Sequence, residues 1–360
     1  MSGVRTAVAQ LLAAAVRAGL APGAVAAWVG LGQSAPSTVA TGTADLGPPP
    51  APATADTVFD LASLTKPLAT ATLVLLARRG GRLDLDTRVG QLLPELAARP
   101  LGERSVLELL THSSGLPAWA PLYALCRGRR ERLAAVLGEL PLEAAGRQVV
   151  YSCPGFITLG LALESLHGRP LDRLFAEAVA APLGLGIGFG PRPGDRVAAG
   201  AGVPAAEHRL IAERGLDESW IPATGPGLPD DGNARFLGGA AGNAGLFGRA
   251  LDVLALASVY LPGGGLLTDE ERALATGNHT PGLGQARGLG WQLASSPGCS
   301  AGASLAPEAF GHTGFTGTSL WVDPHRRLIA VLLTNRTHPG HGEVDLHPLR
   351  RRFHDLLAQP

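Results

Sequence analysis

Apolar positions recur at helical spacing or alternate along strands at both ends of the chain. Residues 4–19 carry apolar side chains at the spacing of an amphipathic helix, and Ala24–Gly30 and Ser37–Asp45 are typical of two strands joined by a polar turn. Near the other end, Thr318–Asp323 and Leu328–Asn335 form a second predicted strand pair. The pattern therefore predicts an α/β (α+β) chain whose strands come from its two ends.

The middle of the chain is predicted to be mostly helical, and a further helix over residues 345–357 closes it. S/T-x-x-E patterns that begin at Ser105 and Thr268 are typical capping boxes at helix N-termini. Two Gly- and Pro-rich loops, 184–202 and 222–248, have a length that often lines a functional site.

Composition supports one large folded body. The 360 residues are 46% hydrophobic and 17% charged, which is enough to bury a sizeable core and excludes a disordered chain. No repeat or flexible linker divides the sequence. We therefore expect a sheet region formed by residues 1–62 and 286–360, packed against a mostly helical region formed by residues 63–285.

Charge and hydropathy exclude several classes of partner. The formal net charge is zero, so no broad basic surface exists to hold nucleic acid. No apolar run reaches the roughly 18 residues of a membrane span, and we expect no membrane partner. Gln10 and Arg17 interrupt the apolar N-terminal stretch that a signal peptide needs, so we expect a cytoplasmic protein.

Neither a metal nor another cofactor is expected. Cys126, Cys153 and Cys299 are odd in number and form no C-x-x-C pair, which argues against disulfides and thiolate metal sites. Four histidines between positions 338 and 354 could gather round a divalent metal. Their spacing straddles a loop and a helix start, however, and we interpret them as exposed polar positions.

Lys66 is the only lysine of the chain, since every other residue among the 30 Lys and Arg is arginine. Arginine supplies positive charge but cannot accept a proton, whereas a lysine amine can. Ser63 lies three residues earlier, on the same face of a predicted helix, and its hydroxyl becomes nucleophilic only when a neighbour removes its proton. The spacing predicts that Lys66 is that base; the alternative is a leftover surface lysine.

The helix that follows supports the first interpretation. Residues 69–77 are apolar nearly all round, which is typical of a buried helix, and burial is expected to lower the pKa of Lys66 toward neutrality. Pro67 is compatible with this helix only in its first turn.

Two further motifs occur in the order that acyl-transfer chemistry would use. Tyr151, in VVYSCPGF, could pass a proton between Lys66 and a leaving group. His312, Thr313 and Gly314, in FGHTGFTGTSLW, lie where a strand edge could bring backbone N–H donors close to a carbonyl. Taken alone, Tyr151 would more simply be a tyrosine at the edge of the core, and the HTG motif would be an ordinary turn.

Together, SLTK, YSC and HTG resemble motifs of the serine β-lactamase and penicillin-binding-protein superfamily, in its class C and family VIII carboxylesterase branch. The resemblance extends over nearly the whole chain, through GRLDLDTRVGQLLPEL, LLTHSSGLP, GGAAGNAGLFG and SLWVDPHRRLIAVLLTNRTHP. It implies an antiparallel sheet built from both chain ends and flanked by helices, beside an all-helical region, with the active site at the junction.

The resemblance also implies roles for individual residues. Ser63 would be the acylated nucleophile, Lys66 its base and Tyr151 a second acid/base. The backbone N–H groups of Ser63 and Phe315 would form the oxyanion hole. His312 would stand where other members carry the lysine of K-T-G, and with Thr313 and Gly314 it would contact the substrate.

Two departures from the family pattern favour a small ester as the substrate. Cys153 replaces an asparagine that in β-lactamases donates to the substrate amide, and His312, only partly charged at pH 7, replaces a permanent cation. Trp119 is a candidate for the apolar mouth of the pocket. Cys153 could be a reactive thiol but is more simply a small, half-buried filler. The alternatives are a β-lactamase or D,D-peptidase, which would act on an amide, and a catalytically idle homologue that binds a ligand.

Overall fold

The protein is described by a computed structural model over residues 2–30, 32–200, 205–225, 227–338 and 344–359. The strands are β1 (Gly23–Val29), β2 (Ser37–Asp45), β3 (Ala51–Pro52), β4 (Phe59–Asp60), β5 (Gly188–Phe189), β6 (Leu246–Gly248), β7 (Gln292–Leu293), β8 (Phe310–Thr313), β9 (Ser319–Asp323) and β10 (Leu328–Thr334). The α-helices are α1 (Ser2–Arg17), α2 (Thr72–Arg79), α3 (Val89–Leu92), α4 (Val106–Leu110), α5 (Leu122–Leu125), α6 (Leu133–Glu139), α7 (Cys153–His167), α8 (Leu171–Phe175), α9 (Ala205–Glu213), α10 (Gly232–Phe236), α11 (Ala250–Ala257), α12 (Asp269–Thr276) and α13 (His347–Ala358).

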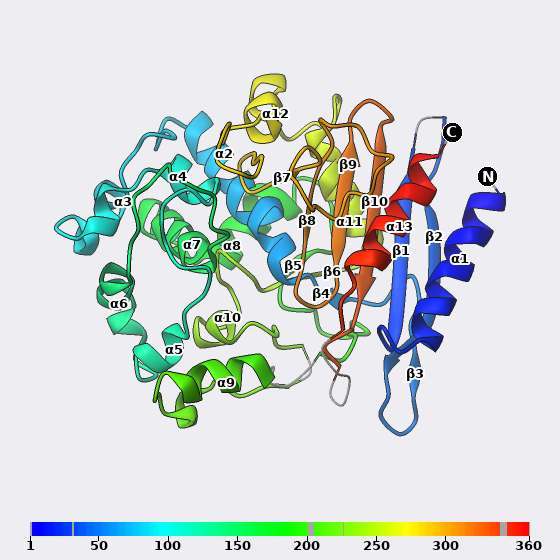
Figure 1. Cartoon of the computed structure of the whole chain (residues 1–360), viewed down its shortest axis with the longest axis horizontal. Helices are drawn as coiled ribbons and strands as arrows, with labels where there is room; N and C mark the ends of the chain where they lie inside the picture. Colours follow the sequence, from blue (N-terminus) through cyan, green and yellow to red (C-terminus); the bar gives the residue numbers. More distant parts are fainter. Residues whose placement is uncertain (1, 31, 201–204, 226, 339–343, 360) are drawn as a thin grey trace.

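Both chain ends contribute to one antiparallel sheet, as predicted. Its strand order is β3-β2-β1-β10-β9-β8-β7, so the N-terminal strands pair with the C-terminal ones through β1 and β10, where Ala24 lies opposite Thr334. Figure 1 shows the sheet beside a mostly helical region. The division of the chain into residue ranges for the two regions stays a prediction.

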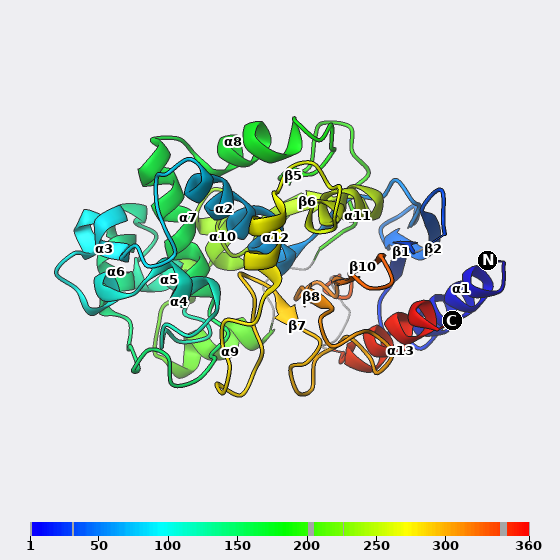
Figure 2. The same ribbon diagram turned by 90° about the horizontal axis from the view of Figure 1, so that it is seen from above.

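Alternation along the central strands buries both faces of this sheet. On β1, Ala24, Ala26 and Trp28 pack with apolar side chains of α1 and α13, while Val25 and Ala27 face the larger core of the molecule. Helices α1 and α13 lie together on one side of the sheet in Figure 2. Such a period of two is what a sheet covered on both faces requires.

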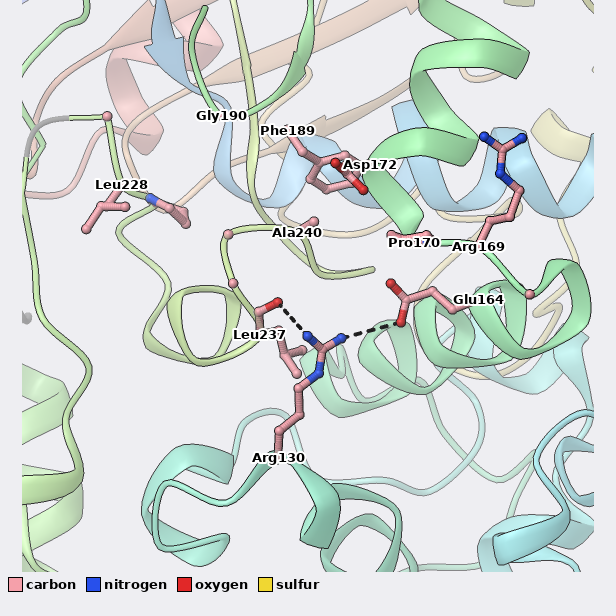
Figure 3. Close-up of a pocket in the computed structure, with 15 residues that line it drawn as sticks. Arg130, Glu164, Arg169, Pro170, Asp172, Phe189, Gly190, Leu228, Leu237 and Ala240 are labelled. Atoms are coloured by element: carbon pink, nitrogen blue, oxygen red, sulfur yellow. Dashed lines mark hydrogen bonds and ion pairs between the residues drawn. The ribbon is translucent and has the colours of Figure 1, made fainter.

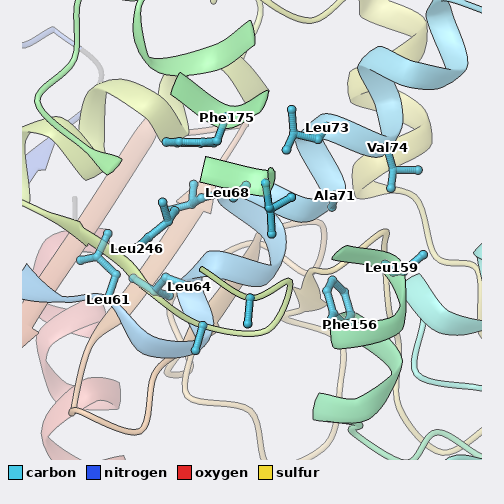
Figure 4. Packing of buried hydrophobic residues seen from close by; sticks show 14 of the residues in the cluster. Leu61, Leu64, Leu68, Ala71, Leu73, Val74, Phe156, Leu159, Phe175 and Leu246 are labelled. Atoms are coloured by element: carbon cyan, nitrogen blue, oxygen red, sulfur yellow. The ribbon is translucent and has the colours of Figure 1, made fainter. Parts of the chain in front are cut away.

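The large core surrounds the segment that carries the S-x-x-K motif. A short 3₁₀ turn (Ala62–Leu64) leads into a π-helical segment (Lys66–Ala71) and then into α2, with Pro67 in the first turn as expected. Leu64, Leu68 and Ala71 are buried against side chains from α7 and β6 (Figure 4). Each buried leucine contributes about 1.5–3 kcal/mol, so this packing holds the motif firmly.

In the helical region, the predicted helix N-termini are correct, whereas the two predicted loops contain secondary structure that the sequence did not reveal. Ser105 and Thr268 accept hydrogen bonds at the N-termini of α4 and α12, which confirms both capping boxes. The two long predicted loops contain α10 and the short strands β5 and β6, and β6 pairs with both β4 and β5 in a small second sheet. Strands of two or three residues show no periodicity from which a sequence could reveal them.

Among the described residues, no helix combines the length and apolar character needed to cross a bilayer.

The backbone of α7 touches the segment that contributes to the Lys66 site. A Cβ atom on Gly242 would lie 1.9 Å from the carbonyl oxygen of Phe156, and one on Gly160 would lie 2.8 Å from the Gly242 nitrogen. Thr70 donates a hydrogen bond to the Gly242 carbonyl at 2.7 Å. Only glycine permits this approach.

We therefore expect Gly242→Ala to lower the free energy of unfolding by about 1–3 kcal/mol or more, because backbone atoms cannot move aside as a side chain can. Gly188→Ala is the matched control, since a Cβ there meets nothing within 4 Å. Urea denaturation of both variants checks the prediction. Equal stability of the two variants would contradict it.

Candidate active site

A strained turn presents Ser63. Ala62 has a φ of +46°, in the left-handed region that side chains other than glycine rarely adopt, and such strain costs about 1–3 kcal/mol unless its surroundings enforce it. Asp60 accepts a hydrogen bond from the Ala62 nitrogen at 2.8 Å, and Thr65 donates to the Ala62 carbonyl at 2.6 Å. Burial raises the pKa of Asp60 to about 6. The turn is thus fixed on both sides of the peptide that precedes Ser63.

Lys66 is completely buried and reaches back to Ser63. Its Nζ donates to Ser63 Oγ at 3.1 Å, to the Asn243 carbonyl at 3.0 Å and to Cys153 Sγ at 3.5 Å. The predicted contact between the hydroxyl and the amine is therefore present, and the alternative of a surface lysine is wrong. The sequence reasoning did not identify Asn243, although it lies in the GGAAGNAGLFG segment.

Tyr151 joins the same group from just before α7. Lys66 Nζ lies 4.9 Å from the centroid of the Tyr151 ring, and interactions with Lys66 and Ser63 lower the pKa of the phenol against the larger effect of burial. His112, at a φ of +60°, accepts a hydrogen bond from the Ser152 nitrogen at 2.9 Å and lies 4.6 Å from the Tyr151 ring, centroid to centroid. The structure therefore brings Ser63, Lys66 and Tyr151 together as the sequence predicted.

The protonation of Lys66 depends on its neighbours. Burial lowers the pKa of Lys66, but interactions with Cys153, Tyr151 and Asp231 raise it, and the net pKa lies above the usual value. The predicted lowering is therefore wrong as a net direction. Burial also raises the pKa of Tyr151 and of Cys153, so both groups are neutral near pH 7. The Lys66 amine is therefore protonated at rest and must lose its proton before it can act as a base.

A cavity of about 290 Å³ opens on Ser63. The predicted residues Trp119, Tyr151, Cys153 and Phe315 all contribute to its wall. Leu210 and Phe315 are 36% and 44% exposed, so together with Trp119 they offer an apolar surface at the site. The volume suits a small ligand.

Three carboxylate side chains, Glu207, Asp230 and Asp231, also line this cavity, and no arginine or lysine does among the described residues. Asp231 caps α10 through the Ala234 nitrogen and accepts a hydrogen bond from the Asn243 amide. The sequence reasoning missed all three. The PDDGN segment was interpreted only as a turn, and nothing in the pattern placed Glu207 near Ser63.

The HTG segment lies behind the cavity rather than in its wall. His312, on β8, is 4% exposed, and its Nδ1 donates to the Thr313 carbonyl at 2.7 Å. Burial and the nearby charges of Lys66 and Arg287 hold the pKa of His312 well below its usual value. His312 is therefore neutral at pH 7 rather than partly charged. Direct contact of His312 and Thr313 with a substrate stays a prediction.

Gly314 brings the end of β8 against the Ser63 turn. A Cβ atom there would lie 2.1 Å from Thr318 Oγ1 and 2.9 Å from the Leu61 carbonyl. Arg350 donates to the Gly314 carbonyl at 2.9 Å. These contacts set Phe315 beside Ser63 in the cavity wall; the oxyanion role of their backbone N–H groups stays a prediction.

Other parts of the described chain offer less chemistry. An open cavity of about 660 Å³ contains a pairing of Arg130 with Glu164 at 3.6 Å, and Arg130 also donates to the Leu237 carbonyl (Figure 3). Its described lining contains no serine, cysteine or histidine. The described residues contain no group of three or more His, Cys, Asp or Glu able to hold a metal; His341, one of the four histidines between positions 338 and 354, lies outside them.

Comparisons with known proteins agree with this geometry. The chain is 30% identical over 331 residues to an Escherichia coli (strain K12) protein named "Putative D-alanyl-D-alanine carboxypeptidase", and the match covers 83% of this chain and 74% of the relative. The fold is similar to that of "EstCE1, a hydrolase with promiscuous acyltransferase activity", with a TM-score of 0.73, 25% identity and 98% of both chains covered.

A class C β-lactamase structure is similar in fold, with a TM-score of 0.76, 20% identity and coverage of 99% of this chain and 98% of the other. The family model described as Beta-lactamase matches residues 8–354, which is almost the entire chain. With the sheet and the Ser63 site, these matches show that the chain belongs to the Beta-lactamase family, whose members are serine hydrolases.

Proposed function

We propose that the protein hydrolyses small carboxylic esters through an acyl-enzyme on Ser63. The observation that carries this proposal is the contact between Lys66 Nζ and Ser63 Oγ, with Tyr151 in reach of both. A buried amine beside a serine hydroxyl is an arrangement suited to nucleophilic acyl transfer.

The expected reaction proceeds in two halves. Once its amine is deprotonated, Lys66 accepts the Ser63 proton while Ser63 Oγ attacks the ester carbonyl, and the resulting oxyanion is stabilised by the backbone N–H groups of Ser63 and Phe315. Tyr151 then gives its proton to the departing alkoxide and regains one from Lys66. Water attacks the acyl-enzyme through the same proton transfers in reverse and restores Ser63.

An ester is favoured over a substrate with a free carboxylate by the charges of the cavity. Glu207, Asp230 and Asp231 face it, His312 is neutral, and the wall contains no described arginine or lysine. Bringing a carboxylate close to like charges raises the free energy of the complex. A neutral acyl ester avoids this repulsion and can contact Trp119 and Leu210.

The second candidate function is that of a β-lactamase or D,D-peptidase. The named E. coli relative favours it, because that relative is 30% identical and the match covers most of both chains. Against it stands Cys153, at the position where β-lactamases of the resembled branch carry asparagine. If the second candidate were right, Cys153→Asn should increase turnover of nitrocefin.

We expect Ser63→Ala and Lys66→Arg each to lower kcat for 4-nitrophenyl butyrate by at least about a thousandfold. Lys66→Arg retains the positive charge but removes the proton acceptor. A loss of activity in this variant would therefore show that Lys66 is needed as a base and not only as a charge. Arg78→Lys on α2, far from the site in the fold, is the conservative control. Intact-mass spectrometry after a fluorophosphonate should locate the adduct on Ser63 in the unaltered protein.

Substantial ester turnover by Lys66→Arg would contradict the assignment of Lys66 as the general base. Absence of any adduct on Ser63 would instead favour an idle, ligand-binding homologue. Nitrocefin acylation without ester turnover would favour the second candidate.

We further expect kcat/KM for 4-nitrophenyl hydrogen succinate to be at least about tenfold lower than for the butyrate ester, because only the succinate carries a carboxylate. Glu207→Gln should narrow this ratio, since the amide still accepts the hydrogen bond that Tyr123 donates to Glu207 Oε1. Glu164→Gln, in the other cavity, is the matched control and should leave the ratio unchanged. An unchanged ratio in Glu207→Gln would show that this carboxylate does not select substrates.

A further inference from the structure

Arg287 is a buried cation that the proposed reaction leaves unused. It lies in the segment between α12 and β7, its side chain is 6% exposed, and its guanidinium carbon is 5.9 Å from the centroid of the Tyr151 ring. It is not part of the cavity wall, so a substrate does not reach it.

Little in the structure offsets the burial of this charge. Nη2 donates to Gln285 Oε1 at 2.6 Å, whereas Nε is buried without a hydrogen-bond partner among the described residues. Among the residues that the structure describes, no carboxylate forms an ion pair with Arg287. Burial lowers the pKa of Arg287 to about 10, which still leaves it charged at neutral pH. A buried charge with so few partners is costly, so a functional reason is needed.

Tyr151 is the group that this charge faces. Several titratable side chains pack round the phenol, each from a different element: Lys66, His112, Cys153, Arg287 and His312.

Both imidazoles in this group are neutral. His112 Nδ1 accepts a hydrogen bond from the Ser152 nitrogen, whereas His312 Nδ1 donates one to the Thr313 carbonyl, so each ring has one fixed tautomer. Desolvation, together with the charges of Arg287 and Lys66, holds the pKa of both histidines well below the usual value. Lys66 changes its protonation during the proposed reaction, and Arg287 is the cation that stays constant.

We propose that Arg287 is a positioning residue of this active site, which holds the Tyr151 ring and stabilises the negative charge that develops on its phenol oxygen. The proposal rests on the proposed function. In acylation the phenol O–H bond breaks as its proton passes to the leaving alkoxide, and the phenolate persists until the Lys66 ammonium returns a proton. A fixed positive charge beside the ring favours that intermediate state without itself exchanging protons.

Three variants test this inference. Arg287→Gln removes the charge, Arg287→Lys keeps it, and Gln285→Ala removes the acceptor that anchors the guanidinium. For Arg287→Gln we expect kcat on 4-nitrophenyl butyrate to fall about tenfold and the Tyr151-linked limb of the pH profile to move up by about one unit, because loss of the cation makes the phenol a weaker acid. Arg287→Lys should leave the Tyr151-linked limb at its original pH, and Gln285→Ala should move this limb by less than Arg287→Gln does.

A direct titration gives a second readout that needs no substrate. Near-ultraviolet absorbance of phenolate follows Tyr151 once the signal of Tyr151→Phe, which retains Tyr123 and Tyr260, has been subtracted. The midpoint pH of the Tyr151 titration should rise in Arg287→Gln and remain unchanged in Arg287→Lys. Thermal melting confirms that each variant is folded.

An unchanged Tyr151 midpoint in folded Arg287→Gln would overturn the inference, and so would an equal shift in Arg287→Lys. If Arg287→Gln does not fold, an unchanged midpoint in Gln285→Ala overturns it instead. Failure of the proposed function is a separate result: the unaltered protein would then show no ester turnover and no fluorophosphonate adduct, while the titration would still report on Arg287.

Discussion

The burial of the Lys66 amine is the constraint round which the rest of the site is arranged. An amine taken completely out of water needs acceptors, and Lys66 finds them in Ser63 and in the Asn243 carbonyl. Lys66 and Asn243 are 177 residues apart in the sequence, so the packing of the core must bring them together. The glycine contact of Gly242 with α7 is what allows the Asn243 carbonyl to come within 3.0 Å of Nζ.

The same constraint explains why the site is built from backbone as much as from side chains. The strained Ala62 is held by Asp60, and the end of β8 approaches it because Gly314 has no Cβ. Strain of this kind persists only where neighbouring contacts enforce it. Ser63 is consequently presented by a rigid turn, whereas residues of α9, α10 and the loops form much of the cavity wall.

Sequence reasoning could recover whatever depends on local spacing. The terminal strands, the two capping boxes and the contact of Ser63 with Lys66 all follow from periods of two, three or four residues. Quantities that depend on long-range packing were not accessible. The small second sheet, the acidic lining from Glu207 and the neutral state of His312 arise where segments far apart in the chain meet. The net pKa direction of Lys66 depends on Cys153 and Tyr151 in the same way.

Cations and carboxylates both lie near Tyr151, and their placement links the proposed chemistry to the proposed choice of substrate. Lys66 Nζ and the Arg287 guanidinium carbon lie 4.9 and 5.9 Å from the centroid of the ring, whereas Glu207 and Asp231 line the cavity. In the proposed reaction, the cations would stabilise a transient negative charge on the phenol, and the carboxylates would oppose a permanent negative charge on the ligand. In the resembled family pattern a lysine stands at the HTG position and meets an anionic substrate. Here that position holds a buried neutral imidazole, so the proposed ester hydrolysis combines the acyl-transfer residues of the family with a site that lacks this cation.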